Sequence, residues 1–208
     1  MPDKIFVTGI GTGVGKTLVA AILAEALHAA YWKPVQAGYD DGTDSTWISD
    51  NTDTVEIFPE GFRLRLPASP HIAAREEGLR ISVNDIAERI PQTNKKLIME
   101  GAGGLLVPIN ENETVADLIV ALGAKVVLVS RNYLGSINHS LLTAAVCKQY
   151  GIQVAGWIFN DQFMSYENEI EKWTGIPSLG SIPFTKNPDK NFILQQAAIL
   201  GPGLNKSL

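Results

Sequence analysis

The stretch Phe6-Val7-Thr8-Gly9-Ile10-Gly11-Thr12-Gly13-Val14-Gly15-Lys16-Thr17 decides the fold of this chain. A short apolar run leads into a glycine-rich loop that ends in Gly-Lys-Thr. Glycines let successive backbone N–H groups face one anion, the lysine adds a positive charge, and the threonine hydroxyl can bind the Mg²⁺ that accompanies a nucleoside triphosphate. Five residues separate Gly9 from Gly15, and three separate Gly11 from Gly15, so the common spacing of four is not kept. The chemistry therefore predicts a phosphate-binding loop, with a plain glycine-rich turn before a helix as the alternative.

Length and composition are those of a single enzyme-sized domain. The chain has 208 residues, of which 45% are hydrophobic, and we predict one domain over residues 1–208. A net charge of −5 without a basic stretch argues against nucleic acid as a partner. The single cysteine, Cys147, is expected to be a small buried hydrophobic residue rather than a nucleophile.

The cysteine count and the N-terminus also bear on location. A lone cysteine forms no disulfide framework, which fits a reducing compartment. The first apolar strand begins within a few residues of Met1, which leaves no room for a signal peptide, and no apolar run reaches the length of a membrane span. The sequence predicts a cytoplasmic protein with no membrane partner.

Short aliphatic runs alternate with helical patterns along the chain. The predicted strands are Ile5–Thr8, Tyr31–Val35, Lys96–Glu100, Lys125–Ser130, Val154–Phe159 and Ser178–Ile182. The predicted helices are Thr17–Ala29, Ser82–Ile90, Val115–Leu122, Asn138–Tyr150 and Glu167–Thr174, and the tail Gly201–Leu208 is expected to be loose. Because the strands are continuously apolar, we predict a doubly wound α/β fold whose mainly parallel sheet is covered by helices on both faces.

Ligands of such folds bind beyond the carboxyl ends of the strands, so polar residues just after strands are the candidates. Glu100 ends the apolar run Leu97-Ile98-Met99, and Asp44 lies in the acidic segment after the second strand. With Thr17 they supply oxygen ligands for Mg²⁺. Lys33, held against the rigid Pro34, can stabilise a developing anion. The alternatives are a helix N-cap for Asp44, a structural salt bridge for Glu100 and an exposed position for Lys33.

Several segments of the chain, the phosphate loop among them, resemble the dethiobiotin synthetase family of P-loop NTPases. The resemblance runs in family order over residues 5–184 and includes Lys33-Pro34-Val35-Gln36-Ala37-Gly38, Ser69-Pro70-His71-Ile72-Ala73, Glu100-Gly101-Ala102-Gly103-Gly104, Leu134-Gly135-Ser136-Ile137-Asn138-His139, Asn160-Asp161 and Gly180-Ser181-Ile182-Pro183. The Glu-Gly-Ala-Gly-Gly run combined with Gly-Ser-Ile-Asn-His is the specific part. The five-residue spacing in the phosphate loop is also typical of this family.

The resemblance implies an activity and a set of site residues. The family uses ATP and Mg²⁺ to close a cyclic urea on 7,8-diaminopelargonate with CO₂, giving dethiobiotin in biotin biosynthesis. The implied ATP contacts are Gly13, Val14, Gly15, Lys16, Thr17, Leu18, Glu100, Gly101, Ala102, Gly103, Asn160, Asp161, Ile182, Pro183 and Phe184, with Asn160 facing the adenine. The implied magnesium ligands are Thr17, Asp44 and Glu100. The implied catalytic residues are Lys16 and Lys33, with Thr12 near the substrate nitrogen.

Substrate contacts are expected at Ala37 and at the helix start Gly135, Ser136, Ile137 and Asn138, whose free N–H groups suit the substrate carboxylate. In the family this helix start comes from the partner subunit, which implies a homodimer with sites at the interface. Two residues depart from the family pattern. Ala37 stands where many members have a serine or threonine, so the hydroxyl contact to the substrate would be missing at this position. Gly13 stands where some members have an acid.

Other functions are less consistent with the sequence. A nucleotide-switch ATPase of the partitioning type shares this fold, but the loop here lacks the extra lysine near its start. Asn160-Asp161-Gln162-Phe163 lacks the lysine and aspartate of guanine readers, and no glutamine-hydrolysing Cys-His pair is present for a larger amide ligase. His71, His139 and Arg131 are given no role, because packing, capping and surface pairing account for them.

Overall fold

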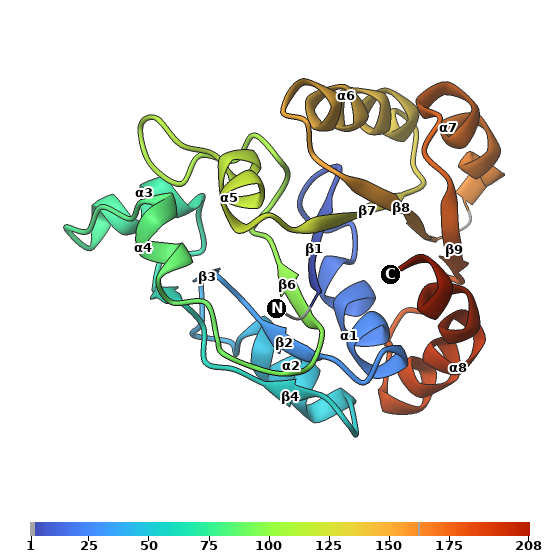
Figure 1. The fold of residues 1–208 in the computed structure, drawn as a ribbon, viewed down its shortest axis with the longest axis horizontal. Coiled ribbons are helices and arrows are strands. Elements are labelled where there is room, and N and C mark those ends of the chain that lie inside the picture. The colour runs from blue at the N-terminus through green and yellow to red at the C-terminus, as the bar shows by residue number, and fades with distance from the viewer. Residues whose placement is uncertain (1–2, 162) are drawn as a thin grey trace.

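The computed structural model describes residues 3–161 and 163–208, and its main sheet has seven strands within them (Figure 1). In spatial order these are β4 (Glu56–Ile57), β2 (Ala30–Trp32), β6 (Leu97–Glu100), β1 (Lys4–Gly9), β7 (Lys125–Arg131), β8 (Val154–Asn160) and β9 (Ser178–Ile182). Every neighbouring pair runs parallel. The order places β1 at the centre, so the loop that follows it opens at the middle of the carboxyl edge.

Helices cover both faces of this sheet. They are α1 (Lys16–Ala26), α2 (Asp44–Asn51), α3 (Pro70–Glu76), α4 (Val83–Ala87), α5 (Val115–Leu122), α6 (Ser136–Gln149), α7 (Glu167–Thr174) and α8 (Lys190–Ser207), with a short 3₁₀ turn η1 (Phe163–Ser165). Because side chains alternate along a strand, Phe6 of β1 enters the core beneath α5, whereas Val7 enters the core beneath α1 and α8. This arrangement confirms the predicted doubly wound α/β fold.

Both cores lie on the faces of the same sheet. This layout agrees with one domain over residues 1–208, which stays a prediction. In the described part of the chain, no helix is both long and apolar enough to cross a lipid bilayer.

The predicted strand Tyr31–Val35 is wrong in extent, because the chain splits there. Only β2 joins the main sheet, and β3 (Val35–Ala37) pairs in parallel with β5 (Phe62–Leu64) in a second, two-stranded sheet. Pro34 has no N–H to donate to a ladder, and its carbonyl accepts instead from Phe62 at 3.0 Å. The break turns the chain away from the sheet directly after Lys33 and opens space beside it.

The expectation of a loose tail at Gly201–Leu208 is also wrong. Those residues continue α8 to Ser207, although the sequence Gly201-Pro202-Gly203 lacks helix-forming residues. Leu204 is fully buried and Gly201 lies against Ala26 of α1, so packing against α1 outweighs the low intrinsic propensity. Figure 1 shows α8 and α1 side by side on this face.

The remaining helices agree with the predictions to within a few residues. Helices α5 and α7 have the predicted bounds, α1 and α4 end earlier, and α6 begins earlier, at Ser136. The helices α2, α3 and α8 and the strands β4 and β5 were not predicted, and most of them are short.

Candidate active site

The phosphate-binding loop joins β1 to α1 with the backbone that its glycines allow. Gly13 and Gly15 have φ angles of 73° and 90°, in the left-handed region that glycine adopts without a steric penalty. At Gly15 space is also limiting, because a Cβ there would overlap with Nδ2 of Asn160. That amide nitrogen donates a hydrogen bond of 2.9 Å to the carbonyl of Val14. The end of β8 therefore supports the loop from behind.

A cavity of about 740 Å³ opens over this loop at the carboxyl edge of the sheet. Its walls come from the phosphate loop, the β2–β3 turn, the start of α2, the segment before α3 and the glycine-rich run after β6. Among the predicted site residues, its lining includes Thr12, Gly13, Gly15, Lys16, Thr17, Lys33, Ala37, Asp44, Glu100, Gly101, Ala102 and Gly103. The structure thus brings together both predicted lysines, all three predicted metal ligands and Ala37.

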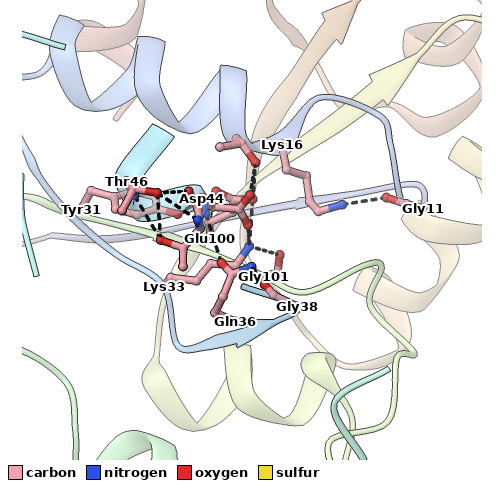
Figure 2. Close-up of polar contacts among 12 residues, drawn as sticks. Gly11, Lys16, Tyr31, Lys33, Gln36, Gly38, Asp44, Thr46, Glu100 and Gly101 are labelled. Carbon is pink, nitrogen blue, oxygen red and sulfur yellow. Dashed lines mark hydrogen bonds and ion pairs between the residues drawn. The ribbon is translucent and has the colours of Figure 1, made fainter. Parts of the chain in front are cut away.

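A compact cluster of polar side chains lines this cavity, and Figure 2 shows these side chains pointing toward one another. The Lys33 ammonium is 2.6 Å from Oδ2 of Asp44 and 2.9 Å from Oε1 of Glu100. The hydroxyl of Thr17 donates to the same Glu100 oxygen at 2.9 Å and lies 3.2 Å from Oδ1 of Asp44. Lys33 and Glu100 are only 4% and 1% exposed, so these charges interact with little screening by water.

Local structure explains why these side chains meet. Glu100 follows Ile98 by two residues on β6, so it points to the face of the sheet that α1 covers, and Thr17 lies in the first turn of α1. Asp44 is fixed at the start of α2, where Thr43 forms a capping box with Thr46 and the backbone N–H of Asp44 donates to the Gln36 side chain at 3.2 Å.

The surroundings shift the pKa of both lysines. Burial alone would lower the pKa of Lys33, but Glu100 and Asp44 outweigh it and raise that pKa above 10.5. Burial lowers the pKa of Lys16 to about 8, against the opposing effect of Glu100. The Lys16 ammonium donates to the carbonyl of Gly11 at 2.8 Å. Lys33 therefore stays protonated well into the alkaline range, whereas Lys16 loses its proton at a lower pH.

The donor set of this cluster fits Mg²⁺. A hydroxyl and two carboxylates are the hard oxygen ligands that this ion prefers, and Mg²⁺ keeps several waters and phosphate oxygens in addition. Within residues 3–161 and 163–208, no group of three or more His, Cys, Asp or Glu side chains could hold a metal.

The other predicted nucleotide contacts lie outside this cavity. Asp161 lines a second cavity of about 430 Å³ with Thr12, Gly13 and Val14, and pairs there with Arg131 at 3.5 Å. Ile182 is fully buried, which leaves only its backbone for a ligand, whereas Phe184 is 64% exposed. The Asn160 amide nitrogen is used by Val14, so its adenine contact stays a prediction. Of the other predicted contacts, Leu18 is half-buried on α1 and Pro183 is exposed.

The helix start at Gly135–Asn138 does not line the 740 Å³ cavity of its own chain. The expectation that all its N–H groups are free is wrong at Ser136, which is fully buried and donates its N–H to the Tyr133 carbonyl at 2.9 Å. The neighbouring Leu134 is 88% exposed. Apart from Ser136 and the half-buried Ile137, this helix start is thus exposed at the surface of the chain.

Two side chains of the site were not singled out from the sequence. Tyr31 donates its hydroxyl to Oε2 of Glu100 at 2.8 Å, and Gln36 holds the start of α2. Tyr31 could have been found, because it precedes Lys33 by two residues in the strand that the sequence predicts over Tyr31–Val35, and such residues share a face of a strand. Gln36 carried no comparable signal, since its partner lies beyond an irregular loop.

Taken together, the fold and this site define a P-loop nucleotide-binding domain. A family model described as an AAA domain matches residues 3–190. The chain is 46% identical over 186 residues to the ATP-dependent dethiobiotin synthetase BioD of Christiangramia forsetii, covering 88% of each chain. It is 52% identical over 160 residues to the enzyme of the same name from Cytophaga hutchinsonii, covering 76% of each. The chain belongs to the dethiobiotin synthetase family.

Solved structures confirm the fold alone. A ParA family ATPase from Chlorobium tepidum has a TM-score of 0.59 at 17% identity, with 99% of this chain and 96% of that chain covered. A plasmid partition protein from Borrelia burgdorferi has a TM-score of 0.65 at 11% identity, with both chains fully covered.

Proposed function

We propose that this chain is an ATP-dependent dethiobiotin synthetase that closes a cyclic urea on 7,8-diaminopelargonate with CO₂ and releases ADP and phosphate. The observation that carries this proposal is the cluster of the buried Lys33 and Glu100 with the half-buried Asp44 beside the phosphate loop, in a chain of this family. Three oxygen ligands and two lysines that line one large cavity suit phosphoryl transfer to a bound substrate.

The reaction proceeds by charge movement rather than through a nucleophilic side chain. One amine of the substrate loses a proton and takes up CO₂ as a carbamate, and a carbamate oxygen attacks the γ-phosphorus of ATP while ADP leaves. The second amine then attacks the carbon of this carbamoyl phosphate and closes the ring as phosphate leaves. Lys16 and Lys33 would stabilise the negative charge that develops, and Thr12, which also lines the cavity, would lie near the substrate nitrogen.

Mg²⁺ would be held by Thr17, Asp44 and Glu100, where it would neutralise phosphate charge. Lys33 already pairs with both carboxylates, so it keeps them close together and oriented toward Thr17. Ala37 contributes an apolar wall with Val35 and Pro67 where the aliphatic part of the substrate would lie.

The nucleoside end of ATP is assigned to Asn160, Asp161, Ile182, Pro183 and Phe184. Asp161 and the phosphate loop line one cavity, and the exposed ring of Phe184 offers a flat apolar surface for a base. The cytoplasm is the proposed location, supported by the single buried cysteine.

The proposed active unit is a homodimer in which Gly135–Asn138 of one subunit complete the site of the other. Near this helix start a groove of about 410 Å³ runs between α6 and the segment after β6, lined by Leu106, Val107 and Leu142. Leu106 and Leu142 are 55% and 57% exposed, so an apolar surface is available for a second copy of the chain.

Phosphate release tests the activity. The purified protein with ATP, Mg²⁺ and bicarbonate is expected to release phosphate only when a 7,8-diamine acid is added, and mass spectrometry should show the cyclic urea. A monoamine analogue is the matched negative control. Substrate-independent ATP hydrolysis with no urea product would instead favour a nucleotide-switch ATPase. The similarity of the fold is the observation that supports this alternative.

A mixed dimer tests the shared site. One subunit carries Lys16→Ala and the other Gly135→Leu, so that one of the two active sites combines an intact loop with an intact partner helix. Activity near half of the wild-type value per dimer is expected. If the heterodimer forms and is as inactive as both parents, each subunit works with its own helix start.

A further inference from the structure

Tyr31 completes the set of donors around the proposed metal-binding carboxylate. Its side chain is fully buried, and its hydroxyl donates to Oε2 of Glu100 at 2.8 Å (Figure 2). The other carboxylate oxygen, Oε1, accepts from Thr17 and from Lys33, each at 2.9 Å. The two oxygens of Glu100 therefore have different partners.

Strand register holds Tyr31 in place. Tyr31 of β2 lies opposite Ile98 of β6, and Glu100 follows Ile98 by two residues on the same face. The ring packs in the core beneath α1 and α8, among side chains such as Ile98 and Val7. A phenol in this position cannot swing away from the carboxylate without disturbing the core, so the direction of its hydrogen bond is fixed.

We infer that Tyr31 is a positioning residue that orients Glu100 so that Oε1 faces Thr17, Asp44 and the bound metal. Without the hydroxyl, the Glu100 carboxylate can rotate about its terminal torsion, which is soft, and Oε2 loses its charge-assisted hydrogen bond. Partners that orient metal ligands typically affect metal affinity by about 10–100-fold. The inference rests on the proposed function, since it takes Glu100 to be a ligand of Mg²⁺.

The test compares nucleotide affinity with and without metal. Calorimetry gives the Kd of ADP in EDTA and in Mg²⁺, and the ratio of the two is the gain that the metal provides. Tyr31→Phe is expected to reduce this ratio roughly tenfold while the Kd in EDTA stays within about twofold of wild type. Tyr150→Phe, at the end of α6, removes a phenol hydroxyl far from the cluster and should leave the ratio unchanged.

The outcomes separate the inference from the proposed function. If wild-type protein itself gains nothing from Mg²⁺, the metal site fails and the inference fails with it. If wild type gains and Tyr31→Phe retains the full ratio, or loses affinity equally with and without metal, Tyr31 is only a packing residue. The metal-dependent ratio is the readout that a structural role alone would not change.

A second measurement covers the case in which Tyr31→Phe does not fold. Wild-type protein containing 3-fluorotyrosine has five tyrosines, and the Tyr31 resonance is assigned by elimination with Phe variants of Tyr39, Tyr133, Tyr150 and Tyr166. The Tyr31 resonance is expected to shift when Mg²⁺ is added to the ADP complex. An unchanged Tyr31 resonance would overturn the inference.

Discussion

Replacing Lys33 by methionine is expected to lower stability because it leaves two carboxylates without their shared cation. The Lys33 ammonium is 2.6 Å from Asp44 and 2.9 Å from Glu100, and Glu100 is 1% exposed. Removal of one partner from a buried ion pair costs about 3–5 kcal/mol. The side chain of Asp44 is 32% exposed, so water offsets part of the loss and the lower end, about 3 kcal/mol, applies. For a chain of this size that corresponds to a fall of about 6–12 °C in Tm.

Differential scanning calorimetry measures this effect, with Lys95→Met as the matched control. Lys95 also pairs with a carboxylate, Glu56 at 3.4 Å, but both side chains are almost half exposed, so its loss should cost under about 1 kcal/mol. Addition of Mg²⁺ should restore more stability to Lys33→Met than to wild type, because a cation then replaces the lost charge. A Tm for Lys33→Met as high as that of Lys95→Met would refute the reasoning.

Three further variants or measurements test the site and the core. Lys16→Ala should abolish substrate-dependent phosphate release with an unchanged circular dichroism spectrum, whereas Lys148→Ala on the exposed side of α6 should not; an active Lys16→Ala enzyme would exclude a catalytic role. Glu100→Gln should weaken ATP binding more in Mg²⁺ than in EDTA, and equal losses would count against a metal ligand. Burial raises the pKa of Cys147 to about 11, so at pH 8 its thiol should react on the order of a hundredfold more slowly in native than in unfolded protein, and equal rates would show that it is not buried.

The sequence predicts the main sheet because each long strand is a continuous aliphatic run. The phosphate loop, Lys33 and Glu100 were also predictable, since each follows such a run at the carboxyl edge of the sheet. The small sheet of β3 and β5 was not, because each of its strands has only three residues and its pairing depends on where Pro34 directs the chain. The continuation of α8 through Pro202 could not be predicted from the sequence either. This part of the helix is stabilised by contact with α1, which is distant in sequence.

Within the site, the kind of ligand that the residues suit was more predictable than the hydrogen-bond partner of each side chain. The residue types at positions 17, 44 and 100 indicate oxygen ligands, and the structure places them together. The amide of Asn160 shows the limit of the approach, because nothing in the sequence says that it bonds to the carbonyl of Val14. A side chain near a ligand site can serve the ligand or the loop that holds it, and only the geometry distinguishes the two.

The burial of Glu100 ties the folding of this sheet edge to its chemistry. A nearly inaccessible carboxylate is costly unless donors compensate it, and here three donors do so from three places: Thr17 on α1, Tyr31 on β2 and Lys33 in the turn after β2. Any substitution among these donors therefore changes stability and activity together. Measurements that compare metal-loaded with metal-free binding cancel the stability contribution, because both are made on the same folded protein. They are consequently the measurements that can assign separate roles to residues that share one carboxylate.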